Sequence, residues 1–387
     1  GKNVKLNTVV RTQDEDALVD TMNRVFDLNI DGWFRVNFSS VITIIDAMGG
    51  DHAPKEIVLG ALQAAEEYKT EIVLVGRGED VLNAMRAGGW DTLPAGVEVA
   101  DAPDVVDMHA DPTEVVKQHR TSSMVLGLKM LADGEGDAFI SAGNTGALLT
   151  AATLVVKRIR GIRRAAFAPI MPIGSGSVLI DAGANAECTP EFLLQFGCMG
   201  SLYARKALHK PQPRVALLNN GAEDSKGDGL HKEAYRLLQE ASGRGLLHFT
   251  GNIEARDVLN DKADVIVADG FSGNILLKAV EGTAQYMGRQ IKGIFLRSPA
   301  SKLGYLFCRR GVKALQEQMD YRKIGGSMLV GITKPVIKAH GSSDAVAIRG
   351  AIRQAMDAVN SGFCDEIRAN IASITDARQE AEHVSEA

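Results

Sequence analysis

Residues 41–54 read Val41-Ile-Thr-Ile-Ile-Asp-Ala-Met-Gly-Gly-Asp-His-Ala-Pro54, an apolar β-branched run followed by a small polar loop and a proline. The run is apolar throughout, as in a strand buried on both faces, and the proline suits the first turn of a helix over residues 54–68. A second proline-led helix is expected over residues 190–208. Further apolar runs predict buried strands at 72–75, 138–140, 178–180, 215–218 and 265–267. The sequence therefore predicts an α/β fold with mostly parallel sheets.

Length and composition indicate the class of protein. The chain has 387 residues, more than the roughly 250 to 300 residues that one hydrophobic core usually supports, so we expect two domains. Hydrophobic residues make up 45% of the chain and charged residues 24%, which is typical of a folded globular protein. The net charge of −5, from 43 basic and 48 acidic residues, argues against a nucleic-acid-binding protein.

Cysteine usage and hydropathy indicate the compartment. The 4 cysteines lie far apart and form neither a zinc motif nor a redox motif. The amino end lacks the apolar core of a signal peptide, and no apolar stretch approaches the ~20 residues of a membrane-spanning helix. We therefore expect a cytoplasmic protein. Residues 1–40 do not share the strand-loop-helix order and are treated as an N-terminal extension, and residues 376–387 as a charged tail.

Polar loops rich in small residues follow six apolar runs, at residues 46–54, 141–147, 181–187, 219–227, 269–274 and 340–345. Because the carboxyl ends of parallel strands share one edge of a sheet, we expect one cleft to collect these loops. Glycine lets the backbone approach a ligand, and a helix that starts after the loop directs N–H groups at it, which suits phosphate. The residues expected to line the cleft are Asp46, Gly49, Gly50, Asp51, Asp181, Asn219, Glu223, Asp269, Asn274, His340, Ser342 and Ser343.

Several familiar motifs are missing from these loops. No G-x-G-x-x-G follows a strand, and Lys226 lacks the preceding glycine of a P-loop, so neither bound NAD nor ATP is indicated. The residues around Ser272 are one short of a G-x-S-x-G nucleophile elbow, and no cysteine lies beside a histidine in a glycine-rich loop. Covalent catalysis is therefore not indicated.

The ionisable residues in the loops have two interpretations. His52, His340 and Lys226 lie in small polar loops, where they could act on a ligand or simply face solvent. Lys226 is the preferred point charge for an anion. The loop aspartates could hold a metal, but carboxylates at strand ends more often cap the next helix or hold a loop in place, so we expect no metal.

Six strings resemble the phosphate acyltransferase family of bacterial phospholipid synthesis: IDAMGGDHAP, SAGNTGA, DAGANAEC, LNNGAEDSKGD, DGFSGNILLK and IKAHGSSDA. They occur in the family's order, and the resemblance covers about residues 41–375. It implies a homodimer whose two-lobed αβα fold is similar to phosphotransacetylases and to the isocitrate dehydrogenase class. The lobes would comprise residues 41–160 with 331–375, and residues 161–330. Two features depart from the family pattern, namely the extra residues 1–40 and the string Gly325-Gly-Ser-Met-Leu-Val-Gly331.

The resemblance also implies a reaction, in which a fatty acyl group passes from acyl-[acyl-carrier-protein] to inorganic phosphate without a cofactor. Phosphate itself would be the nucleophile, which agrees with the missing serine and cysteine motifs. His52 or Asn185 would donate to the thioester oxyanion. The residues expected to contact phosphate are Ser141, Asn144, Thr145, Gly146 and Lys226.

Residues 284–323 are expected to form a basic helical hairpin, with apolar residues on either side of a break at Ser298-Pro299. Such a surface suits anionic lipid or the acidic carrier protein, and would place the protein peripherally at a membrane or at a membrane acyltransferase. The alternative is a hairpin that packs the dimer and whose cations face solvent. Residues 282–316 contain no acidic residue and seven cations: Arg289, Lys292, Arg297, Lys302, Arg309, Arg310 and Lys313.

Two other functions are compatible with the pattern. The first is a metal- and NAD-dependent dehydrogenase of a phosphorylated hydroxy acid on a related fold, which a cluster of metal-binding aspartates would favour. The second is a non-catalytic membrane scaffold that holds carrier protein through the hairpin. A scaffold would leave the six polar loops without an explanation.

Overall fold

A computed structural model describes residues 41–174, 176–318 and 325–372 of the chain. The expected N-terminal extension at residues 1–40 and charged tail at residues 376–387 lie outside this part, as does the end of the expected hairpin. Within the described residues, eleven strands form one sheet in the order β3-β2-β1-β4-β11-β10-β5-β6-β9-β7-β8. Their bounds are β1 Ile42–Asp46, β2 Glu71–Gly76, β3 Val97–Asp101, β4 Ala138–Ser141, β5 Ala166–Met171, β6 Ser177–Ile180, β7 Arg214–Asn219, β8 His248–Glu254, β9 Val265–Val267, β10 Gly326–Val330 and β11 Val336–Ala339.

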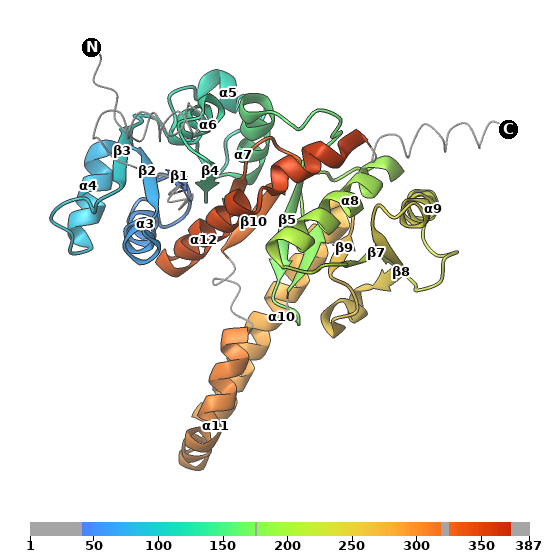
Figure 1. Cartoon of the computed structure of the whole chain (residues 1–387). Coiled ribbons are helices and arrows are strands. Elements are labelled where there is room, and N and C mark those ends of the chain that lie inside the picture. Colours follow the sequence, from blue (N-terminus) through green and yellow to red (C-terminus); the bar gives the residue numbers. More distant parts are fainter. Residues whose placement is uncertain (1–40, 175, 319–324, 373–387) are drawn as a thin grey trace, which may run out of the picture. The chain divides into compact units, whose positions relative to one another are not determined.

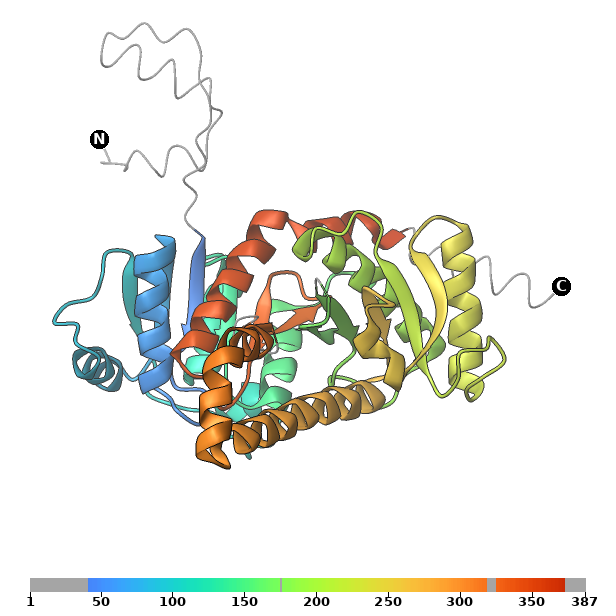
Figure 2. The same cartoon turned by 90° about the horizontal axis from the view of Figure 1, so that it is seen from below.

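Helices cover both faces of this sheet (Figures 1 and 2). Helices α3, α8 and α12 pack on one face, and α6, α7 and α10 on the other. Successive strand residues therefore enter two different cores, with Ile45 in the first and Ile44 in the second. The bounds of the helices are α3 Lys55–Tyr68, α4 Gly78–Ala87, α5 Val115–Gln118, α6 Ser123–Asp133, α7 Thr145–Ala151, η1 Ala152–Val156, α8 Pro190–Ala207, α9 Gly229–Gly243, η2 Ala255–Asn260, α10 Gly270–Leu296, α11 Pro299–Gln318 and α12 Ala345–Ser361.

The predicted elements form where the sequence placed them. All six predicted strands are present, and so are the helices expected over residues 54–68 and 190–208. Pro190 occupies the first turn of α8 as expected, whereas Pro54 is the N-cap of α3 and lies one position before the helix. The α/β fold with a mostly parallel sheet is therefore confirmed.

The strand directions differ from the expectation that all carboxyl ends share one edge. The pairs β10 with β11, β10 with β5 and β5 with β6 are antiparallel. Three reversals make β6, β9 and β7 run opposite to β1, β4 and β11, because the remaining pairs are parallel. The polar loops therefore fall into two groups, at opposite ends of the strands that meet in the middle of the sheet. The division into two lobes at residues 160 and 331 stays a prediction.

The basic segment forms a helical hairpin, as predicted, with α10 and α11 separated at Ser298. The two helices contact each other and extend away from the sheet (Figure 1), and the rings of Phe295 and Tyr305 pack edge to face with centroids 5.2 Å apart. The first helix starts at Gly270, earlier than the expected residue 284. The carboxylate of Asp269 caps it by accepting from the Ser272 N–H, and no proline follows until Pro299.

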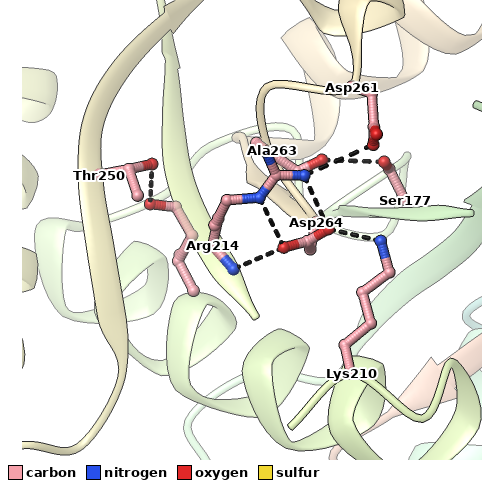
Figure 3. A network of polar contacts seen from close by, with 8 residues as sticks. Ser177, Lys210, Arg214, Thr250, Asp261, Ala263 and Asp264 are labelled. Carbon is pink, nitrogen blue, oxygen red and sulfur yellow. Dashed lines mark hydrogen bonds and ion pairs between the residues drawn. The ribbon is translucent and has the colours of Figure 1, made fainter. Parts of the chain in front are cut away.

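A buried ionic network lies at the amino ends of β6, β7 and β9 (Figure 3). Asp264 accepts hydrogen bonds from the backbone N–H of Arg214 at 2.8 Å, from the Arg214 guanidinium and from the Lys210 ammonium. The exposed Asp261 is a weaker partner of Arg214, at 3.4 Å. Burial raises the pKa of Asp264, but the hydrogen bonds from Arg214 and Lys210 outweigh this and hold the pKa well below its usual range. The network ties the starts of two strands together.

Candidate active site

A cavity of about 850 Å³ lies between the middle strands and α10. Strand β5 contributes Phe167, Pro169 and Met171 from one face, together with Ile170, and α10 contributes residues three and four positions apart, which lie on one side of a helix. Most of this wall is apolar. Its main lining residues are Met108, Phe167, Pro169, Ile170, Met171, Leu277, Val280, Met287, Ile291 and Val312.

One end of the cavity is polar, and Lys338 of β11 is its most buried charged residue. Lys338 is 9% exposed, and its ammonium donates to the carbonyl oxygen of Ala142 at 3.0 Å and to that of Ala339. Burial lowers the pKa of Lys338 to about 8, although the negative charges of Asp46 and Asp51 oppose this change. The end of β11 therefore presents a buried cation to the cavity.

Asp46, at the end of β1, is the buried acid nearest to this lysine. Its carboxylate accepts from the hydroxyls of Ser123 at 2.6 Å and Ser141 at 2.7 Å, and from the backbone N–H of Met48. Burial raises the pKa of Asp46, and these hydrogen bonds and the charge of Lys338 counteract the rise. No direct ion pair joins Asp46 to Lys338 in the described chain, so Asp46 compensates the lysine only through space.

Three of the six loops meet around this polar end. The Asp51 N–H donates to the Gly341 carbonyl at 2.8 Å, which joins the first loop to the last. A Cβ at Gly49 would lie 2.7 Å from the backbone nitrogen of Gly143, so only glycine allows the loops to come this close. Gly50, with φ at +107°, also needs the freedom of glycine. Close backbone packing explains the two glycines.

Two more loops meet at the other end of the cavity. The carboxylate of Asp181 accepts hydrogen bonds from four backbone N–H groups and from one side-chain amide. The donors include the backbone N–H of Phe167 at 2.9 Å and that of Asn185 at 2.7 Å. The Gly270 N–H donates to the Asn185 carbonyl at 2.8 Å. Burial raises the pKa of Asp181, while this cage of donors lowers it. Asp181 and Asp269 thus organise loops and cap a helix, as carboxylates at strand ends often do.

Four of the predicted site residues line the cavity: Thr145, Asn274 and His340 from the loops, and Lys313 from the predicted hairpin cations. The pKa of His340 is lowered, first by burial and then by the nearby charge of Lys278, and its Nδ1 lies 2.8 Å from the Ser342 hydroxyl. Ser343 is buried nearby, and its hydroxyl has no hydrogen-bond partner among the described residues. The loop at residues 340–345 therefore supplies a cavity residue, His340, and the serine that contacts its ring, Ser342.

Two predicted site residues, Asn144 for phosphate and Asn185 for the oxyanion, already make structural hydrogen bonds. The amide of Asn144 donates to the carbonyls of Met108 and Ala110, and its oxygen caps α7 through the Ala147 N–H. Asn185 donates to the Ala165 carbonyl and to the Asp181 carboxylate. Both amide side chains thus shape the loops that border the cavity.

The sixth loop, residues 219–227, lies apart from the cavity lining. Asn219 donates to the carbonyl of Lys226 and to the side chain of Asn252, and Asn252 donates to the Glu223 carbonyl. These bonds fold the loop against β8. Neither Lys226 nor the exposed His52 is among the residues that line the cavity. Their predicted roles therefore stay predictions.

Three charged residues of the cavity were not singled out from the sequence: Lys278, Glu281 and Lys338. Lys278 pairs with Glu281 at 2.7 Å one turn further along α10. A signal for Lys338 was present in the sequence, because a lysine interrupts an otherwise apolar run immediately before a polar loop. A charged residue inside a buried strand needs a compensating group or a ligand.

Comparison with known proteins identifies the family. A family model described as "Fatty acid synthesis protein" matches residues 41–366. The phosphate acyltransferase of Oceanobacillus iheyensis is 43% identical over 338 residues, which cover 87% of this chain and 99% of that protein. The chain belongs to the phosphate acyltransferase family. A second member of that family, from Listeria monocytogenes, is 43% identical over 85% of this chain and 96% of its own length.

Solved structures give the same fold for this phosphate acyltransferase family member. A phosphotransacetylase from Streptococcus pyogenes matches with a TM-score of 0.56 and 19% identity, covering 84% of this chain and 95% of that chain. A branched-chain phosphotransacylase from Enterococcus faecalis matches with a TM-score of 0.52 and 14% identity, covering 82% and 99%. The predicted likeness to phosphotransacetylases is confirmed, and family membership makes the chain an acyltransferase.

Proposed function

We propose that this protein transfers a fatty acyl group from acyl-[acyl-carrier-protein] to inorganic phosphate, giving acyl-phosphate for phospholipid synthesis. Family membership supports acyl transfer to phosphate and a role in lipid synthesis. The carrier-protein donor is the finer part of the proposal. It follows from the six strings that resemble the family.

The reaction needs no protein nucleophile. An oxygen of hydrogen phosphate attacks the carbonyl carbon of the thioester, a C–O bond forms and the C–S bond breaks. The proton of hydrogen phosphate ends on the carrier thiol, so the products are acyl-phosphate and free carrier protein. The protein has to hold phosphate and thioester together, neutralise charge and exclude water.

The cavity is the observation that carries this proposal. Its apolar wall along β5 and α10 suits a fatty acyl chain, and its polar end at His340 and Lys338 suits an anion. A volume of about 850 Å³ is large enough for a long hydrocarbon substrate. A carbonyl carbon held between the two regions would be within reach of a bound phosphate.

The predicted site residues are of two kinds: some line the cavity, and others lie outside its lining. Thr145, His340 and Asn274 belong to the cavity and are the candidates for direct contact. His52 or Asn185 as the oxyanion donor, and Lys226 as a phosphate contact, require a movement of their loops toward the substrate. Mutagenesis distinguishes the two kinds.

The α10–α11 hairpin supports assembly and peripheral attachment. Large apolar side chains are exposed along it, including Ile294 at 62%, Leu303 at 59%, Leu306 at 56% and Phe307 at 84%. Together with the seven cations, they form an amphipathic surface suited to a second copy of the chain or to an anionic membrane. We propose a homodimer that contacts the membrane or a membrane acyltransferase from the cytoplasmic side. No helix in the described ranges is long and apolar enough to cross a membrane.

The test is to incubate the purified full chain with long-chain acyl carrier protein and phosphate, and to detect acyl-phosphate by mass spectrometry. We expect acyl-phosphate and free carrier thiol in equal amounts, with chelator present and without added nucleotide. Omission of phosphate should abolish both products. Free thiol without acyl-phosphate would indicate a thioesterase, and a requirement for a divalent metal and NAD would favour the dehydrogenase alternative.

A further inference from the structure

Lys338 lines the cavity and has an unfilled hydrogen-bonding capacity. An ammonium group carries three N–H donors, and those of Lys338 reach the carbonyls of Ala142 and Ala339. Within the described chain, no acceptor is found for the third donor. Because Lys338 also lines the cavity, the unfilled position is open to a ligand.

The surroundings of Lys338 make this position specific for an anion. The other three residues of its strand are apolar and fully buried, so water is largely excluded from the lysine stem. The carboxylate of Asp46 is already occupied by two hydroxyls and a backbone N–H, and it forms no ion pair with the lysine in the described chain. A buried charge with incomplete compensation gains most from a negatively charged ligand.

We propose that the ammonium of Lys338 binds the inorganic phosphate that attacks the thioester, with its third N–H donating to a phosphate oxygen. This assignment rests on the proposed function. The two carbonyl contacts fix the direction of the ammonium, so phosphate is held at the end of the apolar wall that would carry the acyl chain. The lysine thus positions the nucleophile and offsets its negative charge.

Other cations of the described chain fit this role less well. Lys278 also lines the cavity, but its side chain is 54% exposed and pairs with Glu281. Lys226 lies in the loop that folds against β8, away from the cavity lining. Exposed or paired cations are screened by water and neighbouring acids, and therefore bind a small anion less tightly than a buried one.

The main experiment compares Lys338→Met with the matched control Lys334→Met. Lys334 lies four residues earlier and also donates its ammonium to a backbone carbonyl, that of Gly136, but it does not line the cavity. We expect Lys338→Met to raise the KM for phosphate by about 30-fold, as for loss of a charged hydrogen bond, with less than about threefold change in the KM for acyl carrier protein. Lys334→Met should keep the wild-type KM for phosphate.

A second measurement uses the unmodified protein, so it does not depend on the folding of a variant. Acetic anhydride labelling of Lys338, read by mass spectrometry, should slow at least fivefold when inorganic phosphate is added. Labelling of Lys334 should not change. Equilibrium dialysis of radioactive phosphate without an acyl donor should show binding to the wild-type chain and to Lys334→Met.

The results separate this inference from the proposed function. If the wild-type chain forms acyl-phosphate, but folded Lys338→Met keeps the KM for phosphate and phosphate does not protect Lys338, the role of Lys338 is refuted and the acyl transfer stands. If the wild-type chain forms no acyl-phosphate, the proposed function fails. Dialysis and protection then decide by themselves whether Lys338 binds phosphate.

Discussion

Two buried clusters in this sheet contain the same kinds of groups and differ in how completely they are paired. At the carboxyl ends of β1, β4 and β11, Asp46 has a raised pKa and Lys338 a lowered one, so burial dominates at both residues. At the amino ends of β6, β7 and β9, Asp264 has a lowered pKa, because hydrogen bonds from Arg214 and Lys210 exceed the effect of burial. Only the first cluster borders the cavity.

The difference leads us to assign a structural role to the Asp264 cluster and, under the proposal above, a phosphate-binding role to Lys338. Asp264 receives several donors and holds the starts of neighbouring strands in place, so its charge is compensated within the protein. Lys338 is compensated only in part, which costs stability but leaves room for an anion. We therefore expect mutations in the first cluster to change phosphate kinetics, and mutations in the second to change folding.

The largest effect is expected for Asp264→Asn. Removal of one partner from a buried ionic network typically costs about 3 kcal/mol of unfolding free energy, so the chain should unfold at clearly lower urea concentration. The KM for phosphate of the remaining folded protein should not change. Asp261→Asn, at the exposed edge of the same network, should cost less than about 0.5 kcal/mol and serves as the control. Equal losses in both variants would contradict a central role for Asp264.

The Asp264 cluster also predicts how the free energy of unfolding changes with pH. A carboxyl whose pKa is lowered by folding adds stability above its unfolded pKa of about 3.9, and this contribution is lost as the pH falls toward the folded value. Urea unfolding between pH 6 and pH 3 should therefore show a loss of stability below about pH 4 that is absent from Asp264→Asn. A parallel decrease in both proteins would assign acid sensitivity to other carboxyls.

The cations of α10 and α11 provide a third case, because they are exposed on the surface of the hairpin. Reversal of Arg309 and Arg310 to glutamate should weaken binding to anionic vesicles by about 30-fold at low salt, since each basic residue near such a surface contributes about 1 kcal/mol. Wild-type binding should fall as salt rises, because the Debye length is about 8 Å at physiological ionic strength. Co-sedimentation and size-exclusion chromatography measure both outcomes. A changed oligomeric state with intact vesicle binding would instead assign these cations to the dimer.

Phosphate binding at Lys338 should weaken in alkali. With a pKa of about 8, the ammonium loses its proton between pH 7 and pH 9, and the KM for phosphate should rise by about tenfold over that range. The neighbouring charges that affect this titration are Asp46, Asp51 and Lys278, together with His340 on the adjoining loop. Lys338→Met should show a high KM that is nearly independent of pH. A wild-type KM that is flat to pH 9 would contradict the role of the lysine charge.

The smallest effect is expected for Lys226→Ala. Its sequence context predicted a phosphate contact whose loss would weaken phosphate use by about tenfold, whereas its position outside the cavity lining leads us to expect less than threefold. The KM for phosphate of the two lysine variants, measured side by side, decides which cation serves the site. A tenfold effect at Lys226 would show that its loop moves over the cavity during the reaction.

Much of the architecture was predictable from short stretches of sequence. Strands such as β1 and β6 are apolar on both faces, and the first turn of α8 carries proline, so their positions follow from local composition. The hairpin break at Ser298-Pro299 was predictable for the same reason. The early start of α10 was not, because it depends on the capping contact made by Asp269.

The amino-acid sequence by itself determined the α/β class, the loops and, through six ordered strings, the family. Only the tertiary structure decided which loops share the cavity, because the antiparallel pairs at β10 and β5 connect segments more than 150 residues apart in the chain. The proposal that favours Lys338 over Lys226 also depends on the tertiary structure, because only Lys338 lines the cavity. Lys226 stands in a loop that looks like a ligand site, whereas Lys338 stands in an apolar strand, and burial and unfilled hydrogen bonds depend on neighbours that local sequence does not specify.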